Sequence, residues 1–200
     1  MVLIVVRHGQ SVWNQENKFT GWKDVDLTER GVNEAKSAGR LMKNITIEHA
    51  YVSTMIRTRK TFEHIINEQS QQLCNSVVYS KELIERDYGD LVGKNKQNIK
   101  EEYGEENLHK WRRSYATAPP KGESLQDVCV RVGKFYDENI RKHIDSKKNV
   151  LIVAHGNSLR ALFVHLGIHT PENIEKFEIT TGVPICITTD DNEYAYMNMY

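Results

Sequence analysis

Two histidines each stand just after an apolar segment, and the two segments lie far apart in the chain. His8 follows residues 3–6 and Arg7, and His155 follows residues 151–154. After each histidine come a glycine, an amide residue and a serine. Short, continuously apolar segments are typical of buried parallel strands, and open α/β folds bind ligands where such strands end. We therefore expect both imidazoles to meet in one crevice at the same edge of a sheet.

The residue types at this expected crevice favour phosphoryl chemistry. A neutral imidazole can attack phosphorus and carry the phosphoryl group covalently. Arg7 keeps its charge and presents a fork of donors that fits phosphate oxygens. The polar turns that contain Ser11 and Ser158 offer free backbone N–H groups to an anion. For a single histidine, a hydrogen-bonded role at a strand end would be the commoner interpretation, but two histidines in matched contexts favour a shared site.

Other charged residues are candidates to complete the site, and each has a plainer alternative. Arg57 follows a predicted strand end and would be a second phosphate clamp, or else a solvated helix charge. Glu85 follows two apolar residues and would be a general acid/base, although a surface glutamate fits the pattern equally well. Lys96, Arg112 and Arg113 lie in a polar stretch and would cover an anionic substrate, or else form a solvated helix face.

A metal site is the main chemical alternative, because histidine is a common zinc ligand and the chain has eight. Arg7 adjoins His8, and Arg160 closely follows His155, so positive charge accompanies both candidate ligands. Neither motif contains Asp or Glu, and the sequence has no HExxH motif or zinc-type Cys/His spacing. We therefore expect no metal at this site.

Alternating strands and helices must position these residues. We expect strands at residues 2–6, 50–52, 77–79, 150–154, 184–189 and 194–197, and helices that start near Thr28, Ser53 or Thr54, Gly122, Ser158 and Pro171. Ser53 or Thr54 would cap its helix, and Leu41 would face inward from the first helix. This order predicts an α/β three-layer sandwich with a mostly parallel central sheet flanked by helices. Residues 85–122 would form a mainly helical inserted lobe, or lid, in a single domain spanning residues 1–200.

Composition restricts the classes of protein to which the chain could belong. Lys and Arg (27) balance Asp and Glu (27), so nothing global points to nucleic acid or an anionic membrane as a partner. The sequence has no apolar segment long enough to span a bilayer and no apparent signal peptide. Cys74, Cys129 and Cys186 are scattered and odd in number, which favours reduced thiols and a cytoplasmic location.

Longer motifs extend the pattern over nearly the whole chain, and with them the chain resembles the cofactor-dependent phosphoglycerate mutases of the histidine phosphatase superfamily. The motifs are Arg7-His8-Gly9, Asn14, Phe19-Thr20-Gly21-Trp22, Leu27-Thr28-Glu29-Arg30-Gly31, Glu85-Arg86-Asp87-Tyr88-Gly89-Asp90-Leu91, Trp111-Arg112-Arg113-Ser114-Tyr115, Ala154-His155-Gly156-Asn157-Ser158-Leu159-Arg160-Ala161-Leu162 and Thr181-Gly182-Val183-Pro184. Arg7-His8-Gly9 alone is a superfamily-level signal, whereas the other motifs are specific.

The resemblance implies interconversion of 3-phosphoglycerate and 2-phosphoglycerate, primed by 2,3-bisphosphoglycerate and without a metal. The partner would thus be a small phosphorylated three-carbon acid. His8 would be phosphorylated and Glu85 would exchange protons with the substrate hydroxyls. Arg7, Arg57, Asn14 and His155 would hold the transferring group together with the Gly156 N–H, and a protonated His155 would add charge there. The rest of the substrate would contact Thr20, Gly21, Tyr88, Lys96, Arg112, Arg113 and Asn157.

The chain departs from the fuller family pattern in ways that leave alternatives open. Only Lys121-Gly122 lies between Pro120 and Glu123, where longer members carry a longer segment, so a monomer and a homodimer both remain possible. The sequence ends at Tyr200, whereas longer members have a C-terminal tail over the site. A related histidine phosphatase, or a bisphosphoglycerate mutase or phosphatase, is therefore the alternative function. A silent phospholigand-binding module is the alternative from another class.

Overall fold

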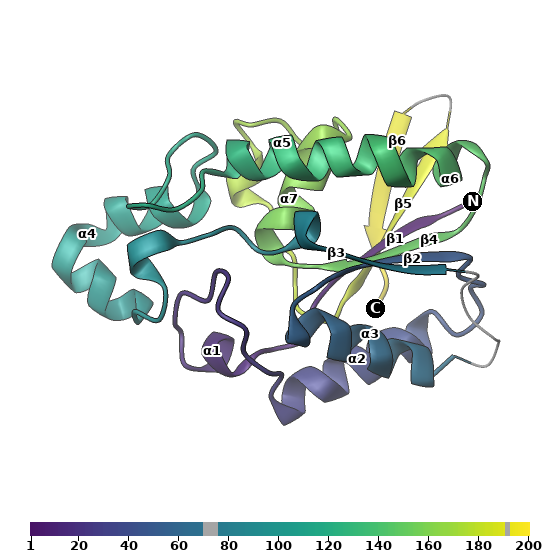
Figure 1. Cartoon of the computed structure of the whole chain (residues 1–200), viewed down its shortest axis with the longest axis horizontal. Coiled ribbons are helices and arrows are strands. Elements are labelled where there is room, and N and C mark those ends of the chain that lie inside the picture. Colours follow the sequence, from purple (N-terminus) through teal and green to yellow (C-terminus); the bar gives the residue numbers. More distant parts are fainter. Residues whose placement is uncertain (70–75, 191–192) are drawn as a thin grey trace.

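The computed structural model describes residues 1–69, 76–190 and 193–200, and these residues form one central six-stranded sheet. The strands lie in the order β3-β2-β4-β1-β5-β6 (Figure 1). Their bounds are β1 (Leu3–Arg7), β2 (His49–Ser53), β3 (Ser76–Ser80), β4 (Val150–Ala154), β5 (Pro184–Asp190) and β6 (Glu193–Asn198). The first four strands in this order pair in parallel, and β5 and β6 add an antiparallel edge. The predicted α/β architecture with a mostly parallel sheet is confirmed.

Strands β1 and β4 form the centre of the sheet. Leu3 pairs with Val150 at one end, and Arg7 pairs with Ala154 at the other. Nearly every side chain of the two strands is buried, because helices cover both faces of the sheet. This burial explains why the sequence of each strand is continuously apolar rather than alternating. The register brings the residues after Arg7 and after Ala154 to the same edge.

Helices form a layer on each side of this sheet (Figure 1). On one side, α2 (Glu29–Leu41) and α3 (Ile56–Asn67) pack on Ile4 and Val6. On the other side, α5 (Leu125–Phe135) and α7 (Gly156–His165) pack on the alternate β1 residues, Leu3 and Val5. A π-turn at Tyr136–Ile140 joins α5 to α6 (Arg141–Asp145). The predicted long helix from residue 122 onward is thus continuous but contains one wider turn.

A mainly helical segment extends from the sheet between β3 and α5, at the left in Figure 1. It comprises short 3₁₀ turns at Lys81–Leu83 and Gly89–Leu91, followed by α4 (Lys96–Arg113). α4 is kinked at Gly104, whose φ of 84° lies in the left-handed region that glycine adopts readily. A separate apolar cluster holds the segment together; its buried members are Phe19, Leu91, Ile99 and Leu108.

Three local predictions are wrong. Leu41 is exposed (38%), because it is the last residue of α2 and turns away from the sheet. Neither Ser53 nor Thr54 caps α3; the cap position is Met55, and the Ser53 hydroxyl binds a distant imidazole instead. Pro171 lies in a turn, and the short helix after it, a 3₁₀ turn, begins only at Ile174.

Two further observations concern membrane-spanning helices and the cysteines. In the described part of the chain, no helix is both long and apolar enough to cross a membrane. Cys129 and Cys186 are free thiols, and Cys74 lies outside the described residues.

Candidate active site

The rings of His8 and His155 lie beside each other, with centroids 5.0 Å apart. Each follows the carboxyl end of a central strand, and the His8 backbone N–H donates to the Ala154 carbonyl at 3.0 Å. The turn after His8 packs so tightly on the first turn of α2 that a side chain at Gly9 or Gly31 would overlap the facing backbone. The predicted convergence of the two imidazoles is confirmed.

His8 is held as a neutral imidazole with one free nitrogen. Its Nδ1 lies 2.7 Å from the Gly9 carbonyl oxygen. A carbonyl can only accept, so Nδ1 carries the proton and Nε2 keeps its lone pair. Burial lowers the pKa of His8 well below its usual range, and the nearby charges of Arg57 and Arg7 lower it further. At neutral pH the buried ring is therefore a ready nucleophile that lines a cavity.

His155 is also neutral, and both of its ring nitrogens have partners within the protein. Arg57 Nε donates to His155 Nδ1 at 3.2 Å, so the ring proton lies on Nε2, which donates to Ser53 Oγ at 2.9 Å. Burial and then the charge of Arg57 lower the pKa of His155 well below its usual range. The resemblance implied that His155 helps to hold the phosphoryl group and, if protonated, adds charge there; here the ring is not among the described residues that line the cavity, and its lowered pKa favours the neutral form. Both ring nitrogens are engaged, and the ring is fully buried.

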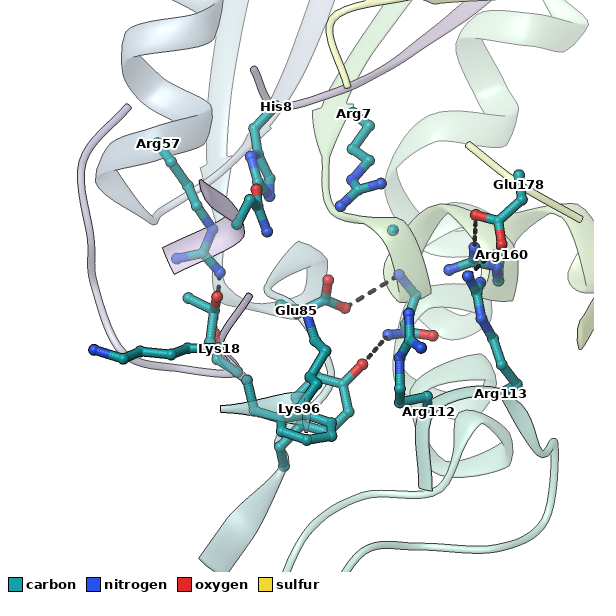
Figure 2. A pocket seen from close by; sticks show the side chains of 17 residues that line it. Arg7, His8, Lys18, Arg57, Glu85, Lys96, Arg112, Arg113, Arg160 and Glu178 are labelled. Carbon is teal, nitrogen blue, oxygen red and sulfur yellow. Dashed lines mark hydrogen bonds and ion pairs between the residues drawn. The ribbon is translucent and has the colours of Figure 1, made fainter. Parts of the chain in front are cut away.

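Two arginines point into the cavity from opposite sides of His8 (Figure 2). Arg57 is fixed by bonds from its guanidinium to the carbonyls of Lys23 and Gly21, both at 3.0 Å. Arg7 Nη1 donates to the Ile179 carbonyl at 2.8 Å. Its buried Nε finds no hydrogen-bond partner among the described residues. A buried cationic donor without an acceptor indicates that the cavity is built to receive an anion.

The cavity has a volume of about 190 Å³, small enough to suit a compact ligand. Of the predicted site residues, it is lined by Arg7, His8, Asn14, Thr20, Gly21, Arg57, Glu85, Tyr88, Lys96, Arg112, Arg113, Gly156 and Asn157. Four further lining residues were not predicted as site residues: Lys18, Phe19, Arg160 and Glu178. Seven Lys and Arg side chains thus face two carboxylates in the described lining. This imbalance favours a ligand with more than one negative charge.

Glu85 projects into the centre of the cavity (Figure 2). Its Oε1 accepts the backbone N–H groups of Asn157 at 3.1 Å and Arg86 at 2.8 Å. The Asn157 side chain in turn donates to the Tyr88 hydroxyl at 3.0 Å. The first turn of α7 and the segment after Glu85 are therefore tied together on the cavity wall. These bonds fix the carboxyl group within the same cavity as His8, where it can exchange protons with a bound ligand.

Lys96 lies close to several other cationic side chains. Burial, followed by the charges of Arg112, Arg7 and Arg113, lowers the pKa of Lys96 to about 8. An anionic ligand between these groups would stabilise the ammonium form further, because an opposite charge nearby favours the charged state. Among residues 1–69, 76–190 and 193–200, no group of three or more His, Cys, Asp or Glu side chains is placed to hold a metal ion.

Sequence spacing could have revealed some of the missed residues but not all. Arg160 lies four positions after Gly156, so a helix there puts both on one face. Lys18 and Phe19 directly precede the predicted Thr20. Glu178 lies in the connection before β5, where the sequence has no period from which its direction could be inferred.

Comparison with known proteins places this geometry in a family. The sequence profile of the histidine phosphatase superfamily (branch 1) matches residues 3–199. A 2,3-bisphosphoglycerate-dependent phosphoglycerate mutase from Bartonella bacilliformis is 50% identical over 185 residues, which cover 92% of this chain and 89% of that protein. A protein of the same name from Brucella canis is 48% identical over the same shares.

Solved structures give the same fold. Bacillus stearothermophilus YhfR superposes with a TM-score of 0.82 at 25% identity, over 97% of this chain and 94% of that chain. A putative alpha-ribazole-5′-P phosphatase from Escherichia coli has a TM-score of 0.81 at 22% identity, over 100% and 96%. That likeness concerns the fold alone. The profile match over nearly the whole chain, together with relatives of about half identity, shows that this protein belongs to the histidine phosphatase superfamily.

Proposed function

We propose that the protein is a 2,3-bisphosphoglycerate-dependent phosphoglycerate mutase that interconverts 3-phosphoglycerate and 2-phosphoglycerate. The observation that carries the proposal is a neutral, buried His8 in one small cavity with Arg7, Arg57 and Glu85. Relatives that are 48–50% identical over most of their length bear this enzyme name. The excess of positive charge in the cavity fits a substrate with a phosphate and a carboxylate.

In the proposed reaction, His8 Nε2 attacks phosphorus and becomes phosphorylated. The Nδ1–H bond to the Gly9 carbonyl stabilises the positive charge that develops on the ring. Arg7 and Arg57 neutralise the equatorial oxygens of the transferring group, which is the main requirement of a loose phosphoryl transition state. Glu85 takes the proton of the attacking substrate hydroxyl and returns it to the leaving oxygen. Bound 2,3-bisphosphoglycerate would supply the phosphoryl group that first loads His8.

The remaining lining residues would hold the non-reacting part of the substrate. Lys96, Arg112 and Arg113 would bind its second anionic group, and Asn14, Thr20, Gly21, Tyr88, Gly156 and Asn157 would contribute polar contacts. We assign His155 a different role from the one expected: it positions Arg57 without touching the ligand. Residues 85–122 would act as a lid that keeps water from the phosphorylated histidine. A cytoplasmic location and a monomeric or homodimeric state remain predictions.

The decisive experiment measures conversion of 3-phosphoglycerate with and without 2,3-bisphosphoglycerate, with free phosphate assayed in parallel. A mutase should be stimulated by the bisphosphate and should form 2-phosphoglycerate faster than free phosphate. No stimulation, with phosphate accumulating faster, would instead identify a phosphatase, in which water accepts the phosphoryl group. Incubation with labelled bisphosphate should also leave acid-labile, alkali-stable label on the protein. A binding module would show none.

A further inference from the structure

A carboxylate that belongs to the protein already occupies part of the cation-lined cavity. The two oxygens of Glu178 pair with two different arginines at the rim (Figure 2). Oε1 pairs with Arg113, at the end of α4, and Oε2 lies 3.4 Å from Arg160 Nη2, on α7. All three side chains line the same cavity as His8 and Glu85. The ion pairs of Glu178 therefore link α4, in the mainly helical segment, to α7, which packs on the central sheet.

Arg160 is a fixed member of this cluster. Its side chain is 6% exposed, and its Nε donates to the Phe177 carbonyl at 2.9 Å. It also lies close over the start of α7, because a Cβ at Gly156 would be 3.2 Å from Arg160 Nη1. Burial, followed by the charges of Arg113 and Arg7, lowers the pKa of Arg160 to about 10, and the charge of Glu178 opposes this change. The guanidinium is thus held in place, and a nearby anion favours its charged form.

Glu178 is the exposed and weakly held partner in these ion pairs. Its side chain is 67% exposed and belongs to the connection between a 3₁₀ turn and β5 rather than to a helix or strand. Ion pairs with so exposed a partner are weak, because water competes for the carboxylate. An anionic group on a ligand that is anchored at Arg7 and Arg57 has the advantage of being already held in the cavity. Such a group can therefore replace the Glu178 carboxylate.

We propose that Arg160 joins Arg113 in binding the ligand's distal anionic group, and that Glu178 occupies this position beforehand as an internal counter-ion which that group displaces. The chemical class of that group is a carboxylate or a phosphate separated from the transferred phosphoryl group by a short linker. The inference rests on the proposed function only in taking the ligand to be a small polyanion. Glu178 would then set the affinity for two-ended anions.

The test measures anion binding by calorimetry in an otherwise complete chain that carries His8→Ala, so that no phosphoryl transfer consumes the ligand. Tripolyphosphate, which has two separated anionic ends, and inorganic phosphate, which has one, are titrated into proteins with and without Glu178→Gln. The matched control is Glu175→Gln. Glu175 lies in the same connection and also pairs with α4, at 3.4 Å from His109 Nε2, but outside the cavity lining.

Glu178→Gln should tighten tripolyphosphate binding by about two- to fivefold, the scale of one exposed ion pair, and tighten phosphate binding less. Glu175→Gln should change neither. Unchanged or weaker tripolyphosphate binding would overturn the proposal, because Glu178 would then merely hold Arg113 in place. An equal gain for phosphate would also overturn it, because the effect would then be loss of charge alone. Titration with 3-phosphoglycerate separately tests the proposed function: failure to bind it, alongside the tripolyphosphate shift, would refute only that function.

Discussion

Ser53→Ala perturbs the cavity without removing any group that faces it. The Ser53 hydroxyl is fully buried and accepts the His155 Nε2–H at 2.9 Å. Without it, the imidazole cannot move its proton to Nδ1, because Arg57 Nε–H already points at that nitrogen from 3.2 Å. Either the Nε2–H stays unpaired or the contact with Arg57 breaks.

The expected loss of stability and the expected loss of phosphorylation rate both follow from these contacts. An unpaired buried donor costs about 1–3 kcal/mol of folding free energy. For a chain of 200 residues, that corresponds to a Tm lower by roughly 2–12 °C. Displacement of a positioning contact by about 1 Å can reduce a rate by up to about 100-fold. Arg57 keeps its bonds to the Lys23 and Gly21 carbonyls, so we expect a roughly tenfold slower phosphorylation of His8.

Rapid-quench measurement of phosphoenzyme formation, together with thermal unfolding, checks both values. Ser158→Ala is the matched control, because its buried hydroxyl accepts the His155 backbone N–H at 3.0 Å and does not contact the ring. It should lose comparable stability. Its phosphorylation rate should stay within about twofold of the parent, a much smaller change than the roughly tenfold loss expected for Ser53→Ala. If the two variants lost phosphorylation rate equally, the role of Ser53 in orienting Arg57 through His155 would be refuted.

Three further predictions test the site. His8→Ala should abolish acid-labile labelling by 2,3-bisphosphoglycerate while circular dichroism stays unchanged; retained label would exclude His8 as the nucleophile. Glu85→Gln should slow mutase turnover by roughly 100-fold or more, the scale of a lost general acid/base, and a parental rate would make Glu85 a bystander. Burial lowers the pKa values of His8 and His155 below the unfolded value of 6.5, so the unfolded chain binds protons that the folded chain does not. Urea unfolding should therefore show stability falling between pH 6.5 and 5 by up to about 1.4 kcal/mol per pH unit for each histidine, and a flat profile would contradict the neutral assignments.

The sequence predicted the elements whose pattern is set by burial alone. Strands β1 and β4 are buried on both faces, so their continuous apolar runs predicted both the strands and the edge where His8 and His155 meet. The helix faces followed for the same reason, except at Leu41, where the end of a helix turns outward. Such predictions succeed because burial determines whether each position is apolar, whatever the identity of its distant partners.

The errors arose where a side chain's partner lies far away in the sequence. A serine between a strand and a helix fits a helix cap, and nothing local shows that Ser53 instead binds an imidazole 102 positions away. The charge of His155 depends on the same two partners and on burial, so it could not be predicted either. Glu178 lines a cavity rich in Lys and Arg side chains, which come together only in the folded chain.

The pairing of β1 with β4 also determines when the protein becomes chemically competent. Contacts such as the bond from the Val2 N–H to the Asn149 side chain close a loop of 147 residues. During synthesis β1 emerges from the ribosome well before β4, its parallel neighbour, because strands β2 and β3 and helices α2 to α6 lie between them in the chain. His8 is thus synthesised well before the strand that completes its surroundings in the folded protein. A nascent polypeptide that lacks β4 carries the His8 imidazole but not the strand beside it, so the site forms only after β4 has paired with β1.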